Sequence, residues 1–234
     1  MKNDLSQKYI DDFNSALDVY ENSYSHEYLI DLLKNGSIAQ KQAAVISLKT
    51  INNIDDAEIF ISNLTGCDGK IREAVSFRLK DFSTKTPELF IGFDEKYLDA
   101  IIDINGNICR NTIEAIKYFK PYQKFTNNFC PKLIQKTLEI IPPIKTFDIQ
   151  EGKYKINKEV FKLYWYLETI SEFVEFIDTK ELCKILSDTK DVNDYTIREK
   201  TAKILSKLQP NEILSEIKNQ LSQDQNYYVR RVSK

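Results

Sequence analysis

The chain has 234 residues, and its 33 basic and 35 acidic side chains leave a formal net charge of −2. Hydrophobic residues make up 42% and charged residues 29%, a balance that is typical of a folded globular protein and not of a disordered chain. The near-neutral charge argues against unspecific binding of nucleic acid, and the lack of a run of about 18 apolar residues argues against a membrane span.

The first helical patterns cover 5–20 and 26–33 and predict a pair of helices. No uninterrupted apolar stretch follows the positively charged start, so we expect no secretory signal. The cysteines form no C-x-x-C pair, and a disulfide framework is usually denser and more regular. We therefore expect reduced cysteines in a cytoplasmic protein, with a structural disulfide as the alternative. The cysteines are Cys67, Cys109, Cys130 and Cys183.

A five-residue motif recurs along the chain. The segments 68–72 and 194–198 read D-x-x-I-R, and 226–230 reads N-x-x-V-R. Weaker copies stand at 37–41 and 106–110. Each copy begins with a residue type that is favoured at helix N-caps. Apolar residues follow the motif at spacings that mark one helix face, so each copy predicts the start of a helix.

A second set of helical patterns lies between these copies and predicts a pair of helices in each repeat. A sixth, degenerate copy of the motif centres on Val160. The segment 142–156 opens with two prolines, so we predict a loop insertion there. These patterns predict an all-α fold, an α-solenoid of about six antiparallel helix pairs in a single domain over 1–234. The second helices are expected at 57–64, 97–104, 131–141, 179–186 and 211–221.

The motif and its phase with the helical pattern resemble HEAT repeats, in the short form found in phycobilisome-lyase-like proteins. The resemblance covers most of the chain and implies a HEAT-like superhelix. It also implies that the aspartate of the motif caps its helix and that the arginine bonds to the neighbouring repeat. The alternative is that the arginines reach a phosphate or carboxylate ligand. The residues of this implied internal ladder are Asp68, Asp194, Arg72, Arg110, Arg198 and Arg230.

The sequence carries no recognisable catalytic motif. His26 is the only histidine and has no paired metal ligand, so we expect a surface side chain in the first turn of a helix. The segment 66–69 matches neither dinucleotide-binding nor P-loop patterns, and the acidic residues in 188–194 lack the central glycine and closing glutamate of a calcium loop. We therefore predict no enzymatic activity, no bound metal and no cofactor.

The densest aromatic cluster lies in 161–176. Phe161 and Trp165 are four residues apart and share one helix face, which Glu168 and Glu172 continue. Other residues already supply a core face, so these four predict a stripe that binds a partner protein. The alternative is that the predicted insertion or a neighbouring helix covers the stripe.

The segment 227–234 begins a repeat without the rest of its first helix. We expect a short terminal cap, and the alternative is an apolar edge offered to another molecule.

These observations predict a non-enzymatic protein–protein interaction module: a monomeric adaptor, scaffold or immunity-type inhibitor that binds another protein through the surface of a solenoid. We expect the second helices to form the inner face, and we expect neither nucleic acid nor membrane as a partner. One alternative is a nucleic-acid-processing protein similar to HEAT-like DNA glycosylases, which requires the lysines to gather on one face. Another is an enzyme accessory similar to bilin-lyase HEAT proteins.

Overall fold

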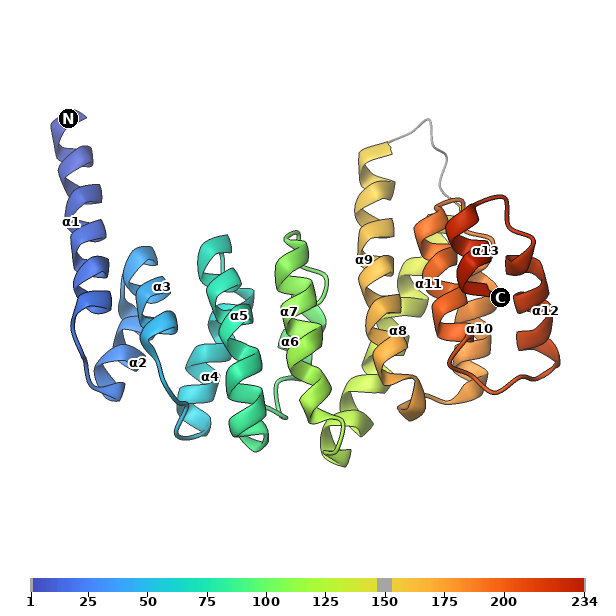
Figure 1. Ribbon diagram of the computed structural model, residues 1–234. Coiled ribbons are helices and arrows are strands. Elements are labelled where there is room, and N and C mark those ends of the chain that lie inside the picture. Colours follow the sequence, from blue (N-terminus) through green and yellow to red (C-terminus); the bar gives the residue numbers. More distant parts are fainter. Residues whose placement is uncertain (1, 147–152, 234) are drawn as a thin grey trace. The chain divides into compact units, whose positions relative to one another are not determined.

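The computed structural model describes residues 2–146 and 153–233, with side chains described for 6–146 and 157–233 (Figure 1). Most of these residues are helical, and none of them forms a strand. The chain divides into two compact units, Met1–Tyr122 and Gln123–Lys234. The α-helices are α1 (Lys2–Glu21), α2 (His26–Asn35), α3 (Ile38–Ser47), α4 (Ile54–Ser62), α5 (Gly69–Lys85), α6 (Asp94–Ala100), α7 (Gly106–Ile116), α8 (Gln123–Lys145), α9 (Lys153–Phe173), α10 (Thr179–Thr189), α11 (Tyr195–Leu205), α12 (Glu212–Ser222) and α13 (Tyr227–Ser233).

Unit 1 is built from two layers of helices. The first layer contains α1, α3, α5 and α7, each of which packs against the next (Figure 1). The second layer contains α2, α4 and α6, and each of these is joined to the first layer through α3, α5 or α7 or through the short 3₁₀ turn after α4. Alternate helices along the chain therefore share a layer, as expected for repeated helix pairs.

Unit 2 has the same two-layer plan. Its first layer contains α9, α11 and α13, and its second layer contains α8, α10 and α12. Each second-layer helix also packs against the first-layer helix that follows it. The helix pairs predicted from the sequence are thus present in both units, and every first-layer helix from α3 onward begins at or near a copy of the motif.

Side-chain caps explain where the first-layer helices begin. Ser37 and Gln40 form a capping box at α3, and the Asp68 carboxylate accepts hydrogen bonds from two backbone amides at the start of α5. Asp194 caps α11, where its carboxylate accepts from the backbone amide and the hydroxyl of Thr196. At α7 the cap is Asn105, one residue earlier than the glycine that opens the motif copy at 106–110.

The cores of both units are rich in aromatic side chains. In unit 1, the rings of Phe60 and Phe82 meet edge to face with centroids 5.2 Å apart. In unit 2, Phe125 and Phe129 stack at 4.9 Å, and Phe173 packs beside them. All five rings are fully buried, so they contribute a large share of the apolar area that each unit removes from water.

The prediction of a loop at 142–156 is wrong at both ends of that segment, where the structure has helix. Helix α8 continues through Pro142 and Pro143 to Lys145, and α9 already begins at Lys153. Burial of Ile144 and of the isoleucines just before the prolines holds this last turn against its neighbours, which outweighs the backbone hydrogen bonds that the prolines cannot donate. Residues 147–152 lie outside the described part of the chain. Within the described part, no helix is long and apolar enough to cross a membrane.

Candidate functional site

Arg72 ties α5 to the loop that precedes α7. Its Nε donates to Oδ2 of Asp103 at 2.6 Å, and its Nη2 donates to Oδ1 at 3.3 Å. Its Nη1 donates to the backbone carbonyls of Gly66 and Cys67. Asp103 also accepts a hydrogen bond from the backbone amide of Asn105, the cap of α7. One arginine therefore fixes the spacing between two successive repeats.

Arg198 makes the same set of contacts in unit 2. Its Nε and Nη2 donate to the two carboxylate oxygens of Asp224 at 2.6 and 3.1 Å, and its Nη1 donates to the carbonyls of Val192 and Asn193. The backbone amide of Asn226 donates to Asp224 as well. The hydrogen bonds from Arg198 hold the pKa of Asp224 below its ordinary value.

Arg230 and Arg110 differ in what they contact. Arg230 donates to the carbonyls of residues 224 and 225, so it repeats the backbone part of the Arg198 pattern. Arg110 is exposed and forms no hydrogen bond or ion pair with the described residues, unlike the ladder role implied for it. Because Asn105 caps α7, the position four residues after the cap is Cys109, whose Sγ donates to the carbonyl of Asp103.

Asp103 and Asp224, the partners of Arg72 and Arg198, were not singled out from the sequence. Both stand two residues before an asparagine cap, in Asp103-Ile104-Asn105 and Asp224-Gln225-Asn226. A D-x-N pattern just before a motif copy is therefore the signal that identifies the acidic partner.

The predicted partner-binding stripe on α9 is largely enclosed by its own unit. Trp165 is only 8% exposed and packs edge to face with Phe161 and Tyr164, at centroid distances of 6.2 and 5.2 Å. Glu168 and Glu172 are half-buried; Glu168 pairs with a lysine of α11, and Glu172 lies near Lys207, just after that helix. A neighbouring helix thus covers the stripe, which was the alternative reading of the sequence.

Two lysines of α11 and Lys207, which follows that helix, close this face of unit 2. Lys200 and Lys203 both donate to the carboxylate of Glu168, and Lys207 lies 3.7 Å from the carboxylate of Glu172. Burial alone would raise the pKa of Glu168, but the hydrogen bonds and charges of the two lysines outweigh it and keep that pKa below its ordinary value. The two glutamates therefore offset two of the three lysine charges within the unit. We call these five residues the α9–α11 zipper.

A groove in unit 1 crosses α3, α5 and α7, with a volume of about 460 Å³. Two large apolar side chains line it although they are well exposed: Ile46 of α3 at 41% and Phe77 of α5 at 67%. Ala74 lies between the neighbouring helices and adds only a methyl group. We call this surface the α5 groove.

Polar side chains border the α5 groove along α5 and α7. The Asn107 amide donates to Glu73 at 3.2 Å, and the Asn111 amide donates to the hydroxyl of Ser76 at 3.3 Å. Lys70 adds a positive charge and forms no ion pair with the described residues. An apolar centre with a polar border is the usual composition of a surface that binds another protein.

The sequence analysis missed this groove, although its signal is present. Ile46 stands five residues after Lys41, and Phe77 stands five residues after Arg72. In α5, the core residues Leu79 and Phe82 lie seven and ten residues after Arg72, on the opposite side of the helix. In α3 and α5, the large apolar residue at the fifth position is exposed and lies away from the core.

The side chains of His26 and Cys109 make structural contacts. His26 Nε2 lies 2.8 Å from Oδ2 of Asp56, a contact that joins α2 to α4, so the expected surface histidine is in fact half-buried. Burial, followed by the charge of Asp103, raises the pKa of the Cys109 thiol to about 12, which keeps it protonated at neutral pH. Among the residues that the structure describes, no three histidine, cysteine, aspartate or glutamate side chains gather to hold a metal ion.

The chain was compared with protein-family models, with curated proteins and with solved structures, and it matches none of them. The resemblance to HEAT repeats therefore rests on the motif and its helical phase.

Proposed function

We propose that the chain is a HEAT-like solenoid of the cytoplasm that binds another protein and catalyses no reaction. The alternating helices of two layers in each unit and the arginine contacts between successive repeats support the solenoid. The α5 groove is the observation that carries the proposed binding activity.

The exposure of Phe77 is the strongest argument for a partner at this groove. A phenylalanine that is 67% exposed leaves most of its ring in water, and Ile46 lies in the same groove. Covering both side chains would gain about 25 cal/mol for each Å² removed from water. Large apolar side chains enclosed by polar neighbours are also where binding energy concentrates in protein interfaces.

The charges around the groove favour a protein over a nucleic acid. Lys70 is the only basic residue that lines it, and Glu73 lies on the same helix. A phosphate backbone would require several unpaired basic side chains. On the corresponding face of unit 2, Lys200 and Lys203 are already held by Glu168. We therefore propose that an apolar side chain of a partner protein enters the groove and contacts Phe77 and Ile46.

The test is affinity purification of the tagged protein from its native cells, with and without nuclease, followed by mass spectrometry. Wild type is compared with Phe77→Asp and with the matched control Ile104→Asp, because Ile104 is 84% exposed and does not line the groove. We expect a stoichiometric protein partner that survives nuclease, persists with Ile104→Asp and falls at least tenfold with Phe77→Asp.

Two results would contradict this proposal. Recovery that disappears with nuclease would favour the nucleic-acid alternative. Equal recovery with Phe77→Asp and Ile104→Asp would remove the α5 groove as the binding surface, and circular dichroism of both variants would verify that they fold.

A further inference from the structure

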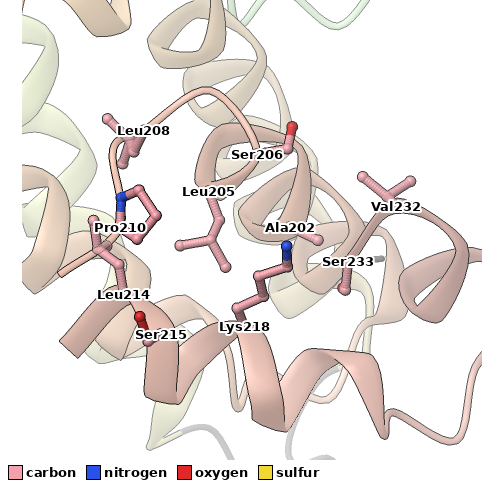
Figure 2. Close-up of a pocket in the computed structure, with 10 residues that line it drawn as sticks. All are labelled: Ala202, Leu205, Ser206, Leu208, Pro210, Leu214, Ser215, Lys218, Val232 and Ser233. Carbon is pink, nitrogen blue, oxygen red and sulfur yellow. The ribbon is translucent and has the colours of Figure 1, made fainter. Parts of the chain in front are cut away.

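The pocket drawn in Figure 2 and the α5 groove differ in the apolar surface that they offer to a partner. The pocket lies among α11, α12 and α13 of unit 2 and has a volume of about 390 Å³ (Figure 2). Its side chains Leu205 and Leu214 are only 7% and 2% exposed, so a partner would remove little apolar area from water there. The α5 groove leaves Phe77 and Ile46 well exposed, so the surface around it has more to gain from a partner.

Contacts between neighbouring first-layer helices of unit 1 fix their relative heights. The hydroxyl of Ser47, the last residue of α3, donates to the backbone carbonyl of Val19 in α1 at 3.4 Å. The guanidinium of Arg78 in α5 donates to the carbonyl of Leu48, the residue after α3. The end of α3 is therefore level with Val19 of α1 and with Arg78 of α5.

One large apolar side chain of each helix is exposed at this level. Tyr20 on α1, Ile46 on α3 and Phe77 on α5 each stand next to one of these contacting residues in the sequence. Their exposed fractions are 49%, 41% and 67%. We call these three residues the outer stripe. It extends the α5 groove, which Ile46 and Phe77 line, by one further helix.

The outer stripe lies on one side of the first layer, away from the second layer. Residues two apart in a helix lie about 160° apart around its axis. In α5, Leu79 is fully buried and stands two residues after Phe77, which directs Phe77 away from the core. In α1, Asp18 accepts a hydrogen bond from the hydroxyl of Tyr24, in the segment that leads into α2, so Tyr20 lies on the opposite side of α1. The α3 member of the stripe lines the groove beside Phe77.

The spacing of the outer stripe suits a helix of a partner. Packed helices lie about 8–10 Å apart, so the stripe presents one apolar side chain at each such step across α1, α3 and α5. Two turns of an α-helix, or seven residues, advance by about 10.5 Å and return to nearly the same face. In an extended strand, residues on one face are about 6.6 or 13 Å apart, which does not match this step. A helix of about 15 residues with apolar residues seven apart therefore matches all three positions.

The residues beside the outer stripe indicate the charge of the partner helix. Lys49 and Lys80 stand three residues after Ile46 and Phe77, and both are exposed. Neither lysine forms a hydrogen bond or ion pair with a described residue. On the other border of the stripe, Glu73 already accepts a hydrogen bond from a neighbouring asparagine amide. Acidic residues along one flank of the partner helix would therefore pair with the two lysines.

We propose that the partner presents an amphipathic helix with one acidic flank, and that this helix lies across α5, α3 and α1. Its apolar residues, seven apart, contact Phe77, Ile46 and Tyr20 in turn, and its acidic residues face Lys49 and Lys80. This inference rests on the proposed function, because it names the kind of segment that enters the α5 groove. It also adds a contact on α1 that the groove alone does not require.

The test is site-specific photocrosslinking to the partner captured in the purification from native cells. p-Benzoyl-phenylalanine replaces Phe77, Ile46 or Tyr20 in turn. The control position is Tyr228, which is 49% exposed like Tyr20 but lies on α13. Mass spectrometry identifies the partner residue that each probe reaches. We expect three crosslinks within one segment of the partner, in the order of the helices and about seven residues apart, and none from position 228.

Charged substitutions test the two ends and the acidic flank of the proposed helix. Tyr20→Asp is expected to lower recovery of the partner at least tenfold, and so is the pair Lys49→Glu with Lys80→Glu. The matched controls on unit 2 are Tyr228→Asp and Lys218→Glu, which change side chains that are also exposed. Both controls should recover the partner as wild type does.

The outcomes separate this inference from the proposed function. A crosslink from position 77 without one from position 20, or crosslinks to distant segments of the partner, overturns the helix and leaves the α5 groove as the binding surface. Unchanged recovery with the two reversed lysines overturns the acidic flank. No crosslink from position 77, together with full recovery by Phe77→Asp, overturns both proposals. Thermal unfolding verifies that each variant folds.

Discussion

The first-layer helices of the two units carry opposite surfaces at equivalent positions of the repeat. Five residues after the buried arginine, α5 has Phe77 and α11 has Lys203. Two residues after it, α5 has Ala74 and α11 has Lys200. In unit 2 these lysines bind Glu168 and close the face, whereas in unit 1 the same positions line the α5 groove.

Some residues of the repeat make the same contacts in both units, and others give each unit a different surface. Arg72 and Arg198 contact the same kinds of partner, an aspartate before the next cap and two backbone carbonyls. These arginine contacts between successive repeats are therefore common to both units. In α5 and α11 the fifth position is directed away from the core, so it can change from lysine to phenylalanine without a change of fold.

The largest effect on stability is expected at Trp165, which occupies the fifth position of α9. Trp165→Ala should lower the free energy of unfolding by about 3–5 kcal/mol, since it removes a buried indole and leaves a cavity. Phe77→Ala at the corresponding position of α5 should change it by less than about 0.5 kcal/mol, because the ring is mostly exposed. Urea unfolding of both variants measures the difference. Equal losses of unfolding free energy would contradict the distinction between a covered and an open fifth position.

A somewhat smaller loss of stability is expected when the contacts of Arg198 with the next repeat are removed. Arg198→Ala should cost about 3 kcal/mol, because Asp224 keeps a carboxylate that is about nine-tenths buried without its partner. The pKa of Asp224 should rise, which NMR titration of the carboxyl carbon would detect. Arg110→Ala is the control, and its expected cost is below about 0.5 kcal/mol because that side chain is exposed. Similar losses of unfolding free energy for the two variants would show that the pair of Arg198 and Asp224 does not stabilise the contact between repeats.

The smallest effect is expected in the α9–α11 zipper. Glu168→Gln should cost about 1–2 kcal/mol, since the amide retains part of the hydrogen bonding but not the charge. The folded pKa of Glu168 lies below its ordinary value of 4.5, so its contribution is complete above pH 4.5 and is lost as the pH falls through the folded value. The stability difference between wild type and Glu168→Gln should therefore be constant from about pH 5 to 8 and shrink in acid. A difference that grows in acid would contradict the zipper.

The sequence predicted the helices better than the surfaces. The caps at Ser37, Asp68 and Asp194 start their helices as the motif indicates, because a cap is a local interaction between neighbouring residues. At α7 the same reasoning was one residue out of register: Asn105 is the cap, and this moved the equivalent of the arginine from Arg110 to Cys109.

Which faces are open could not be predicted from one helix alone. Trp165 and Glu168 have the composition of a binding surface, but α11 packs beside α9 and its lysines pair with the glutamates. Phe77 lacks such a neighbour, and its exposure depends on what α3 and α7 place beside it. The loop prediction at 142–156 was wrong for a similar reason, since it also depends on packing between helices. Burial of Ile144 sustains a helix that the prolines alone would end.

Hydroxyl-radical footprinting of the protein with its captured partner tests the central claim most directly. The α5 groove predicts that oxidation of Phe77 falls at least fivefold in the complex, because the ring loses the 67% exposure that it has in the free chain. Oxidation of Tyr195, which is 41% exposed on α11, should stay unchanged. Protection of Tyr195 with no change at Phe77 would contradict the account and place the partner on unit 2.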